Sequence, residues 1–146
     1  MLRGNALAKL DGKGRLKLPS IYRTVIEPTY GDEFFITSLQ GESVLLYPMP
    51  VYSALEERMF RASKVEPSVK RLRRALNYFG QTATMDAQGR LLIHPLLRED
   101  VQIQGEVAVI GQLDYLEVWN HATFEEQLRN DPLTDADLKE LASFGF

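Results

Sequence analysis

The feature that most constrains the fold of this chain is a short motif that occurs twice. The stretch LDGKGRLKLP occupies residues 10–19, and MDAQGRLLIH follows 75 residues later, at 85–94. Four positions agree at that offset: Asp11, Gly14, Arg15 and Leu16 in the first stretch, and Asp86, Gly89, Arg90 and Leu91 in the second. Arg23 and Arg98 also agree, shortly after the two stretches. DEFFITS then aligns with GEVAVIG, and SVLLYP with YLEVWN, in the same order along the chain. Matched segments in a fixed order indicate an internal duplication.

Each copy is predicted to be mainly β. In the first copy, residues 6–10 and 15–18 alternate between apolar and polar on the two sides of a glycine-containing turn. Two alternating runs around such a turn are the signal of a β-hairpin. Residues 34–37 and 44–47 form a second predicted strand pair. With the helices that follow, the expected fold class is α+β, mainly β with peripheral helices.

Helices are predicted after and between the strand pairs. The spacing of a capping box, which marks a helix start, occurs once in each copy, at Ser53 with Glu56 and at Thr123 with Glu126. In the segment between the copies, Pro67 suits a first helical position and Gly80 a C-terminal stop. Its apolar side chains share one face and its cations occupy the others: Val69, Leu72, Leu76 and Phe79 against Lys70, Arg71, Arg73 and Arg74. The basic face contacts either solvent or another subunit, or it contacts DNA, and the sequence leaves both open. A short final helix is expected after Pro132.

Charge is distributed unevenly along the chain. The formal net charge is −3, but residues 1–74 carry a balance of +5 and residues 75–146 one of −8. Such a split indicates either a cationic binding face or head-to-tail complementarity between subunits. The absence of cysteine excludes disulfides and thiolate metal sites and suits a reducing cytosol. We expect neither a membrane helix nor a secretory signal, because no apolar run has the required length or position.

The first motif gathers cations around a turn. Strand alternation sends Leu16 and Leu18 to one face and Arg15 and Lys17 to the other. Together with Lys9 before the turn and Lys13 at its tip, four cations are presented at once. We expect Asp11 to accept backbone N–H groups of the turn and to aim Arg15, whose guanidinium would then engage phosphate or a guanine edge at lower entropic cost. In the alternative interpretation, the Asp–Arg pair only stabilises the turn and has no part in binding.

The second motif has lost most of these cations. Gln88, Leu92 and Thr84 stand where the first copy has Lys13, Lys17 and Lys9, so Arg90 is the remaining cation at that turn. The first copy should therefore supply most of the electrostatic attraction to a polyanion.

Enzyme readings have little support in the sequence. Gly12 and Gly14 begin a G-x-G, but Lys17 breaks the dinucleotide-binding pattern, and no P-loop occurs. His94 and His121 have no partner at the spacing of a zinc site. We expect no catalytic residue, no metal, no cofactor and no small-molecule substrate.

Four stretches, RGNALAKLDGKGRLKLP, LLYPMP, MDAQGRLLI and LEVWN, resemble the MraZ family of bacterial transcriptional regulators. The resemblance covers about residues 1 to 130. It implies two tandem SpoVT-AbrB-like swapped-hairpin modules that form a pseudo-dimeric β-barrel within one chain. It further implies a ring-shaped homo-oligomer in the cytoplasm that associates with the nucleoid. The expected partner is double-stranded DNA, read at short tandem repeats in the promoter of the division and cell-wall gene cluster that includes the protein's own gene.

The sequence and this resemblance together define expected segments and residues. The first module covers residues 5–50, with a helix to about 63; the linker helix covers 64–77, the second module 78–121, and the C-terminal helices 122–146. The expected DNA-binding residues are Arg3, Lys9, Lys13, Arg15, Lys17, Gln88 and Arg90. The residues expected to fix the turns are Asp11, Gly14, Asp86 and Gly89. The alternative function is a protein-interaction module, either a ring scaffold or an antitoxin-like protein that masks a partner.

Overall fold

The computed structural model describes residues 1–62 and 65–146. Residues 63 and 64 lie outside the described part, and with them the expected end of the first helix and the first residue of the expected linker segment. The strands are β1 (Asn5–Lys9), β2 (Arg15–Lys17), β3 (Glu33–Thr37), β4 (Val44–Pro48), β5 (Gln81–Thr84), β6 (Arg90–Leu92), β7 (Glu106–Gln112) and β8 (Tyr115–Asn120). The helices are α1 (Ser20–Tyr30), α2 (Met49–Arg61), α3 (Pro67–Phe79), α4 (Pro95–Val101), α5 (His121–Asn130) and α6 (Asp135–Ala142).

The order β-β-α-β-β-α occurs twice along the chain, from β1 to α2 and from β5 to α5. We call these the first set and the second set; α3 connects them and α6 follows the second. Six strands form one antiparallel sheet in the order β1-β7-β8-β4-β3-β5, while β2 and β6 form a separate two-stranded ribbon. The α+β class with mostly antiparallel strands is therefore confirmed. The sheet has two edges, β1 and β5, and within the described residues no pairing closes it into the expected barrel.

The strands of the two sets pair with each other. β1 pairs with β7 from Asn5 opposite Ile110 to Lys9 opposite Glu106, and β5 pairs with β3. β4 pairs with β8, and β2 with β6. The predicted hairpin between residues 6–10 and 15–18 is consequently wrong in its pairing: both strands exist, but a single isolated bridge, Leu10 to Leu16, joins them. Each strand finds a longer ladder with a partner from the second set. The second predicted pair, β3 with β4, is confirmed.

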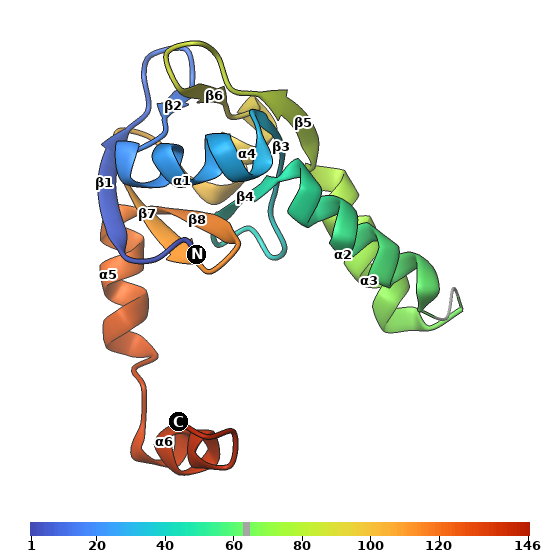
Figure 1. Cartoon of the computed structure of the whole chain (residues 1–146). Coiled ribbons are helices and arrows are strands. Elements are labelled where there is room, and N and C mark those ends of the chain that lie inside the picture. The colour runs from blue at the N-terminus through green and yellow to red at the C-terminus, as the bar shows by residue number, and fades with distance from the viewer. Residues whose placement is uncertain (63–64) are drawn as a thin grey trace.

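One core fills the space between the sheet, the ribbon, α1 and α4 (Figure 1). Leu16 and Leu91 enter it from the ribbon, and both are completely buried. Tyr22 of α1 is also buried, and its hydroxyl donates to the carbonyl oxygens of Gly4 and Val109 at 2.7 and 3.0 Å. Because residues of both sets contribute to this core, neither set could bury its apolar face alone.

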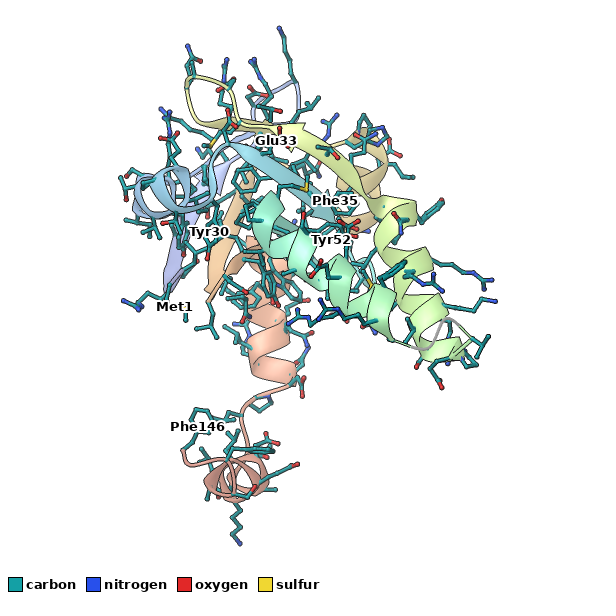
Figure 2. All side chains as sticks on the ribbon, turned by 45° about the vertical axis from the view of Figure 1, so that its right-hand side comes forward. Met1, Tyr30, Glu33, Phe35, Tyr52 and Phe146 are labelled. Atoms are coloured by element: carbon teal, nitrogen blue, oxygen red, sulfur yellow. The ribbon has the colours of Figure 1, made fainter. Side chains whose placement is uncertain are left out.

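Helices α2 and α3 pack against each other and extend from one side of the sheet (Figure 1). Tyr52, Met59 and Leu76 form their buried contact, and Phe35 of β3 stacks on Tyr52 with ring centroids 4.0 Å apart (Figure 2). Pro67 occupies the first turn of α3 and Gly80 its C-cap, as their positions in the sequence predicted, and the helix ends at Phe79, two residues beyond the expected end of the linker segment at 77. The final helix is confirmed as α6.

Both predicted capping boxes are wrong. Helix α2 begins four residues before Ser53, at Met49, with Pro48 at its N-cap and no side-chain cap. In α5 the cap is Asn120, whose Oδ1 accepts the N–H of Thr123 at 3.1 Å. Both helices continue directly from a strand, so the last strand residue occupies the cap position. The S-x-x-E spacing then falls inside the helix, where its side chains face solvent.

Candidate nucleic-acid interface

The ribbon formed by β2 and β6 brings the two D-x-x-G-R motifs side by side. In its register Leu16 lies opposite Leu91, Arg15 opposite Leu92, and Lys17 opposite Arg90. Because side chains alternate across a strand, the two leucines point into the core while the other four side chains share the outer face. Three of these four are cations, two from the first set and one from the second. The outer face is therefore a short, positively charged strip built jointly by both halves of the chain.

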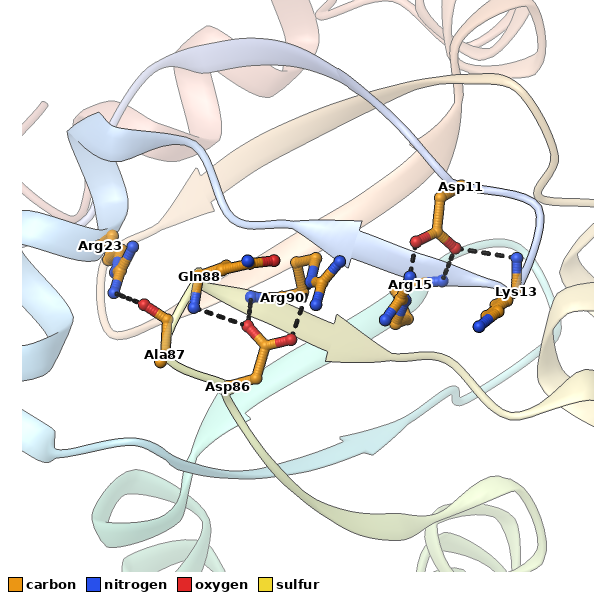
Figure 3. A network of polar contacts seen from close by, with 8 residues as sticks. All are labelled: Asp11, Lys13, Arg15, Arg23, Asp86, Ala87, Gln88 and Arg90. Carbon is orange, nitrogen blue, oxygen red and sulfur yellow. Dashed lines mark hydrogen bonds and ion pairs between the residues drawn. The ribbon is translucent and has the colours of Figure 1, made fainter.

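Asp11 organises the turn that leads into β2 (Figure 3). Its Oδ1 accepts the backbone N–H groups of Lys13 and Arg15, each at 2.9 Å. Its Oδ2 accepts Nε–H of Arg15 at 2.7 Å. Two backbone bonds, Gly14 N–H to the Asp11 carbonyl and Asp11 N–H to the Arg15 carbonyl, close the turn at 3.0 Å each. The carboxylate thus fixes the loop and holds Arg15 by one edge, and the terminal Nη groups are left to engage a ligand.

Asp86 repeats this arrangement at the turn that leads into β6 (Figure 3). Its Oδ1 accepts the backbone N–H groups of Gln88 and Arg90 at 2.9 Å, and its Oδ2 accepts Nε–H of Arg90 at 2.8 Å. Equivalent hydrogen-bond donors lower the pKa of both acids. The backbone N–H of Arg15, followed by its side chain and the N–H of Lys13, lowers the pKa of Asp11 from 3.8 to about 2. The pKa of Asp86 is lowered in the same way, first by the backbone N–H of Arg90. Both carboxylates are therefore ionised at neutral pH.

Two further arginines lie against the turns from the opposite set, and sequence reasoning assigned them no role. A Cβ added at Gly89 would lie 2.8 Å from Nη1 of Arg23, and one added at Gly14 would overlap the guanidinium of Arg98. Nη2 of Arg23 also donates to the Ala87 carbonyl at 3.1 Å (Figure 3). The backbone φ is +81° at Gly14 and +78° at Gly89, a conformation that favours glycine. At both positions glycine is therefore required by the backbone conformation and by the lack of space for a side chain. Each arginine aligns with the other at the 75-residue offset, which is the signal that could have found them.

The backbone also links the two turns. Leu18 N–H donates to the Gly89 carbonyl at 2.8 Å, and Ile93 N–H donates to the Gly14 carbonyl at 3.0 Å. The residue that follows β2 is thus bonded to the second turn, and the residue that follows β6 is bonded to the first turn. Movement of one motif would strain the other, so the two arginines form one unit.

The other residues expected to contact DNA are Lys13, Gln88, Lys9 and Arg3, and they do not all lie at the ribbon. Lys13 and Gln88 are exposed in the two turns at the ribbon's ends. Lys9 belongs to β1, in the other sheet, and it lines with Lys17 and Arg23 a surface groove of about 510 Å³. Arg3 lies beyond the opposite end of β1, next to Gly111, so the structure does not bring it to the ribbon.

Other kinds of site are not found in the described residues. Residues 1–62 and 65–146 contain no group of three or more His, Cys, Asp or Glu side chains that could hold a metal ion. His94 caps α4, with Nδ1 accepting the N–H of Leu96 at 3.3 Å, and His121 lies between Glu106 and Glu125. In the same described ranges, no helix is long and apolar enough to cross a membrane.

Comparison with known proteins identifies the family. A family model described as "MraZ protein, putative antitoxin-like" matches residues 80–142. Curated proteins called transcriptional regulator MraZ align over nearly the whole chain. The protein from Acidobacterium capsulatum is 41% identical over 145 residues, with 99% of each chain covered, and that from Koribacter versatilis is 38% identical, also with 99% of each covered. An Escherichia coli protein of the same description is 34% identical, with 96% of this chain and 95% of its own covered. The chain belongs to the MraZ family.

Proposed function

We propose that the protein is a sequence-specific DNA-binding regulator of transcription that contacts DNA through the β2–β6 ribbon. The observation that carries this proposal is the outer face of the ribbon, where Arg15, Lys17 and Arg90 lie together and each arginine is held by an aspartate through Nε. A face made for stability alone would not place Lys17 directly opposite Arg90, because like charges across a strand pair are destabilising. A polyanion removes that repulsion.

The dimensions and donors of the ribbon suit double-stranded DNA. The major groove admits a two-stranded β-ribbon, and an arginine whose terminal nitrogens are free can bond the O6 and N7 atoms of guanine. Arg15 and Arg90 would take this role. Lys13, Lys17 and Lys9 would contact phosphates on the flanks, and Gln88 would offer its amide to a base or a phosphate. Asp11 and Asp86 hold the arginines through Nε and lower the entropy lost on binding.

The exchange of strands between the two sets supports two tandem SpoVT-AbrB-like modules, 5–50 and 78–121, that act as a pseudo-dimer. One ribbon with about five cations would bind DNA weakly at physiological salt. Several ribbons linked in a ring-shaped homo-oligomer would gain avidity of about 10²–10⁴ when their spacing matches that of repeated sites. We therefore propose that the oligomer reads short tandem repeats, including those in the promoter of the division and cell-wall genes that include its own. The protein would act in the cytoplasm, on the nucleoid.

Fluorescence anisotropy with DNA from upstream of the protein's own gene tests this function. The wild type should bind this DNA more tightly than a scrambled duplex. Arg15→Ala with Arg90→Ala should abolish the preference, while circular dichroism and sedimentation show an intact fold and assembly. If the double variant binds both duplexes like the wild type, the ribbon is not the interface. If the wild type binds no DNA at low salt and instead retains a co-purifying protein, the interaction-module alternative is correct.

A further inference from the structure

The C-terminal segment, residues 131–146, is exposed and buries no side chain against residues 1–62 or 65–130. It contains α6, none of whose residues is buried, and it stands apart from the sheet beyond α5 (Figure 1). Its apolar side chains are exposed: Leu133 by 69%, Leu138 by 52%, Phe144 by 69% and Phe146 by 88%. The helix is nevertheless well specified, because Thr134 and Asp137 form a reciprocal capping box. An eight-residue helix is marginal in water without a surface to pack on. We therefore expect this segment to pack on a surface outside residues 1–130 of its own chain.

The α2–α3 pair offers a surface of matching character. A groove of about 530 Å³ runs between the two helices. Its lining combines the apolar side chains of Tyr52, Met59 and Phe60 with two acids and two arginines, Glu56, Glu57, Arg61 and Arg73. Nε of Arg73 is buried there and has no hydrogen-bond acceptor in the described part of the chain. The exposed face of α3 carries Lys70, Arg71 and Arg74. None of the α3 cations forms a salt bridge within residues 1–62 and 65–146.

The net charges of the α2–α3 helix pair and of the C-terminal segment are opposite and equal. Residues 49–62 and 65–79 contain six cations and three acids, which leaves +3. Residues 131–146 contain four acids and one lysine, which leaves −3. The α2–α3 helix pair is therefore basic as a whole, with its surplus cations Lys70, Arg71 and Arg74 on the exposed face of α3, and the segment at the end of the chain is acidic and apolar. Complementary potentials of this kind set partner choice and register.

We propose that the C-terminal segment of one copy docks along the α2–α3 groove of a second copy. Only residues 131–134 connect α5 to α6, and α5 runs away from the sheet in a different direction from α2 and α3 (Figure 1). A second copy therefore reaches the groove more readily than the same chain does. Because the two surfaces differ, the contact is head-to-tail, and repetition closes into a ring if the rotation permits. This inference rests on the self-association in the proposed function and names the surfaces that make it.

A charge-swap experiment tests the docking. Variant A carries Arg71→Glu and Arg74→Glu in the groove helix, and variant B carries Asp131→Arg and Glu140→Arg in the C-terminal segment; all four side chains are exposed. Sedimentation velocity over a concentration series should show at least about tenfold weaker association for each variant alone. An equimolar mixture of A and B should recover assembly, because the acidic segment of A fits the basic α3 face of B and the basic segment of B fits the acidic α3 face of A. The matched control, Glu42→Arg with Asp114→Arg, reverses two exposed acids outside both surfaces and should associate like the wild type.

Several outcomes would overturn the docking. A wild type that stays monomeric at all concentrations refutes it, and so do variants A and B that associate like the control. Failure of the mixture to recover assembly refutes the pairing of these two surfaces. Anisotropy at low salt on the same samples separates this inference from the DNA-binding proposal. If the wild type assembles by this charge pairing but binds no DNA, the docking stands and the regulator fails. If variant A assembles normally but loses DNA affinity, α3 contacts DNA and the docking is wrong.

Discussion

Removal of the ribbon arginines should change the salt dependence of DNA binding by a calculable amount. Among the cations on or beside the ribbon, five are proposed to contact DNA: Lys9, Lys13, Arg15, Lys17 and Arg90. If each neutralises one phosphate, log K should fall against log salt with a slope of about −4.5 on a duplex that holds one site. Affinity then drops about 500-fold between 50 and 200 mM salt. For Arg15→Ala with Arg90→Ala the slope should be about −2.7, and the same salt step should cost about 40-fold.

Two further variants separate charge from positioning. Gln88→Lys restores at the second turn the cation that Lys13 provides at the first, and its slope should be steeper by about 0.9. Asp11→Asn removes an acid but also the ion pair that holds Arg15 through Nε. It should keep or steepen the slope while it reduces the preference for the specific duplex over a scrambled one, because Arg15 is no longer held in place.

The assay is anisotropy at five or more salt concentrations on one labelled short duplex. A wild-type slope near −1 would show that the ribbon does not engage the phosphates. An unchanged slope after both arginines are removed would show that the cations lie elsewhere, with α3 as the next surface to examine. Loss of specificity in Arg15→Lys, which keeps the charge but not the planar fork, would support direct reading of a base.

Three other predictions concern the stability of the ribbon. Leu16→Ala or Leu91→Ala should each lower the free energy of unfolding by about 2–5 kcal/mol, because both side chains are fully buried opposite each other. Urea titration measures this loss, and additive losses in the double variant would show that the two leucines do not interact. Gly14→Ala should lower the thermal midpoint, because φ is +81° and the new methyl group would overlap Arg98, whereas Gly12→Ala should be neutral because nothing lies within 4 Å; equal midpoints would refute this reading of the turn. The lowered pKa of Asp11 stabilises the fold above pH about 3.8, and this stabilisation is lost as the pH falls toward about 2. The difference in denaturation midpoint between the wild type and Asp11→Asn should therefore shrink across that pH range, and a constant difference would contradict this prediction.

Local patterns in the sequence determined the elements, but not their partners. The limits of α3 were predictable because Pro67 and Gly80 act on their own backbone, whatever surrounds them. The pairing of β1 with β7 was not, because the partner strand lies about 100 residues along the chain and several strands share the same alternating pattern. The helix starts at Met49 and His121 were missed since the preceding strand, rather than a loop, supplies the cap.

For the candidate site, the role of Asp11 and Asp86 in the turns was predictable, since Asp at that position of a turn accepts N–H groups from residues that follow it. The roles of Arg23 and Arg98 were not, although their alignment at the repeat offset marked them. Their contacts are to glycines of the opposite set, and this depends on how the two sets pack together. A reading within one copy could not contain that information.

The most direct test of the central claim uses the absence of cysteine from the chain. A single cysteine can be placed on the outer face of the ribbon with Leu92→Cys, which lies opposite Arg15 and is 56% exposed. Leu39→Cys, 43% exposed in the loop after β3, serves as the matched control. Each variant is labelled with a short photocrosslinker and irradiated with DNA from upstream of the protein's own gene. The account predicts a crosslink to DNA from position 92 and none from position 39, whereas crosslinking from 39 alone, or from neither while binding persists, would contradict it.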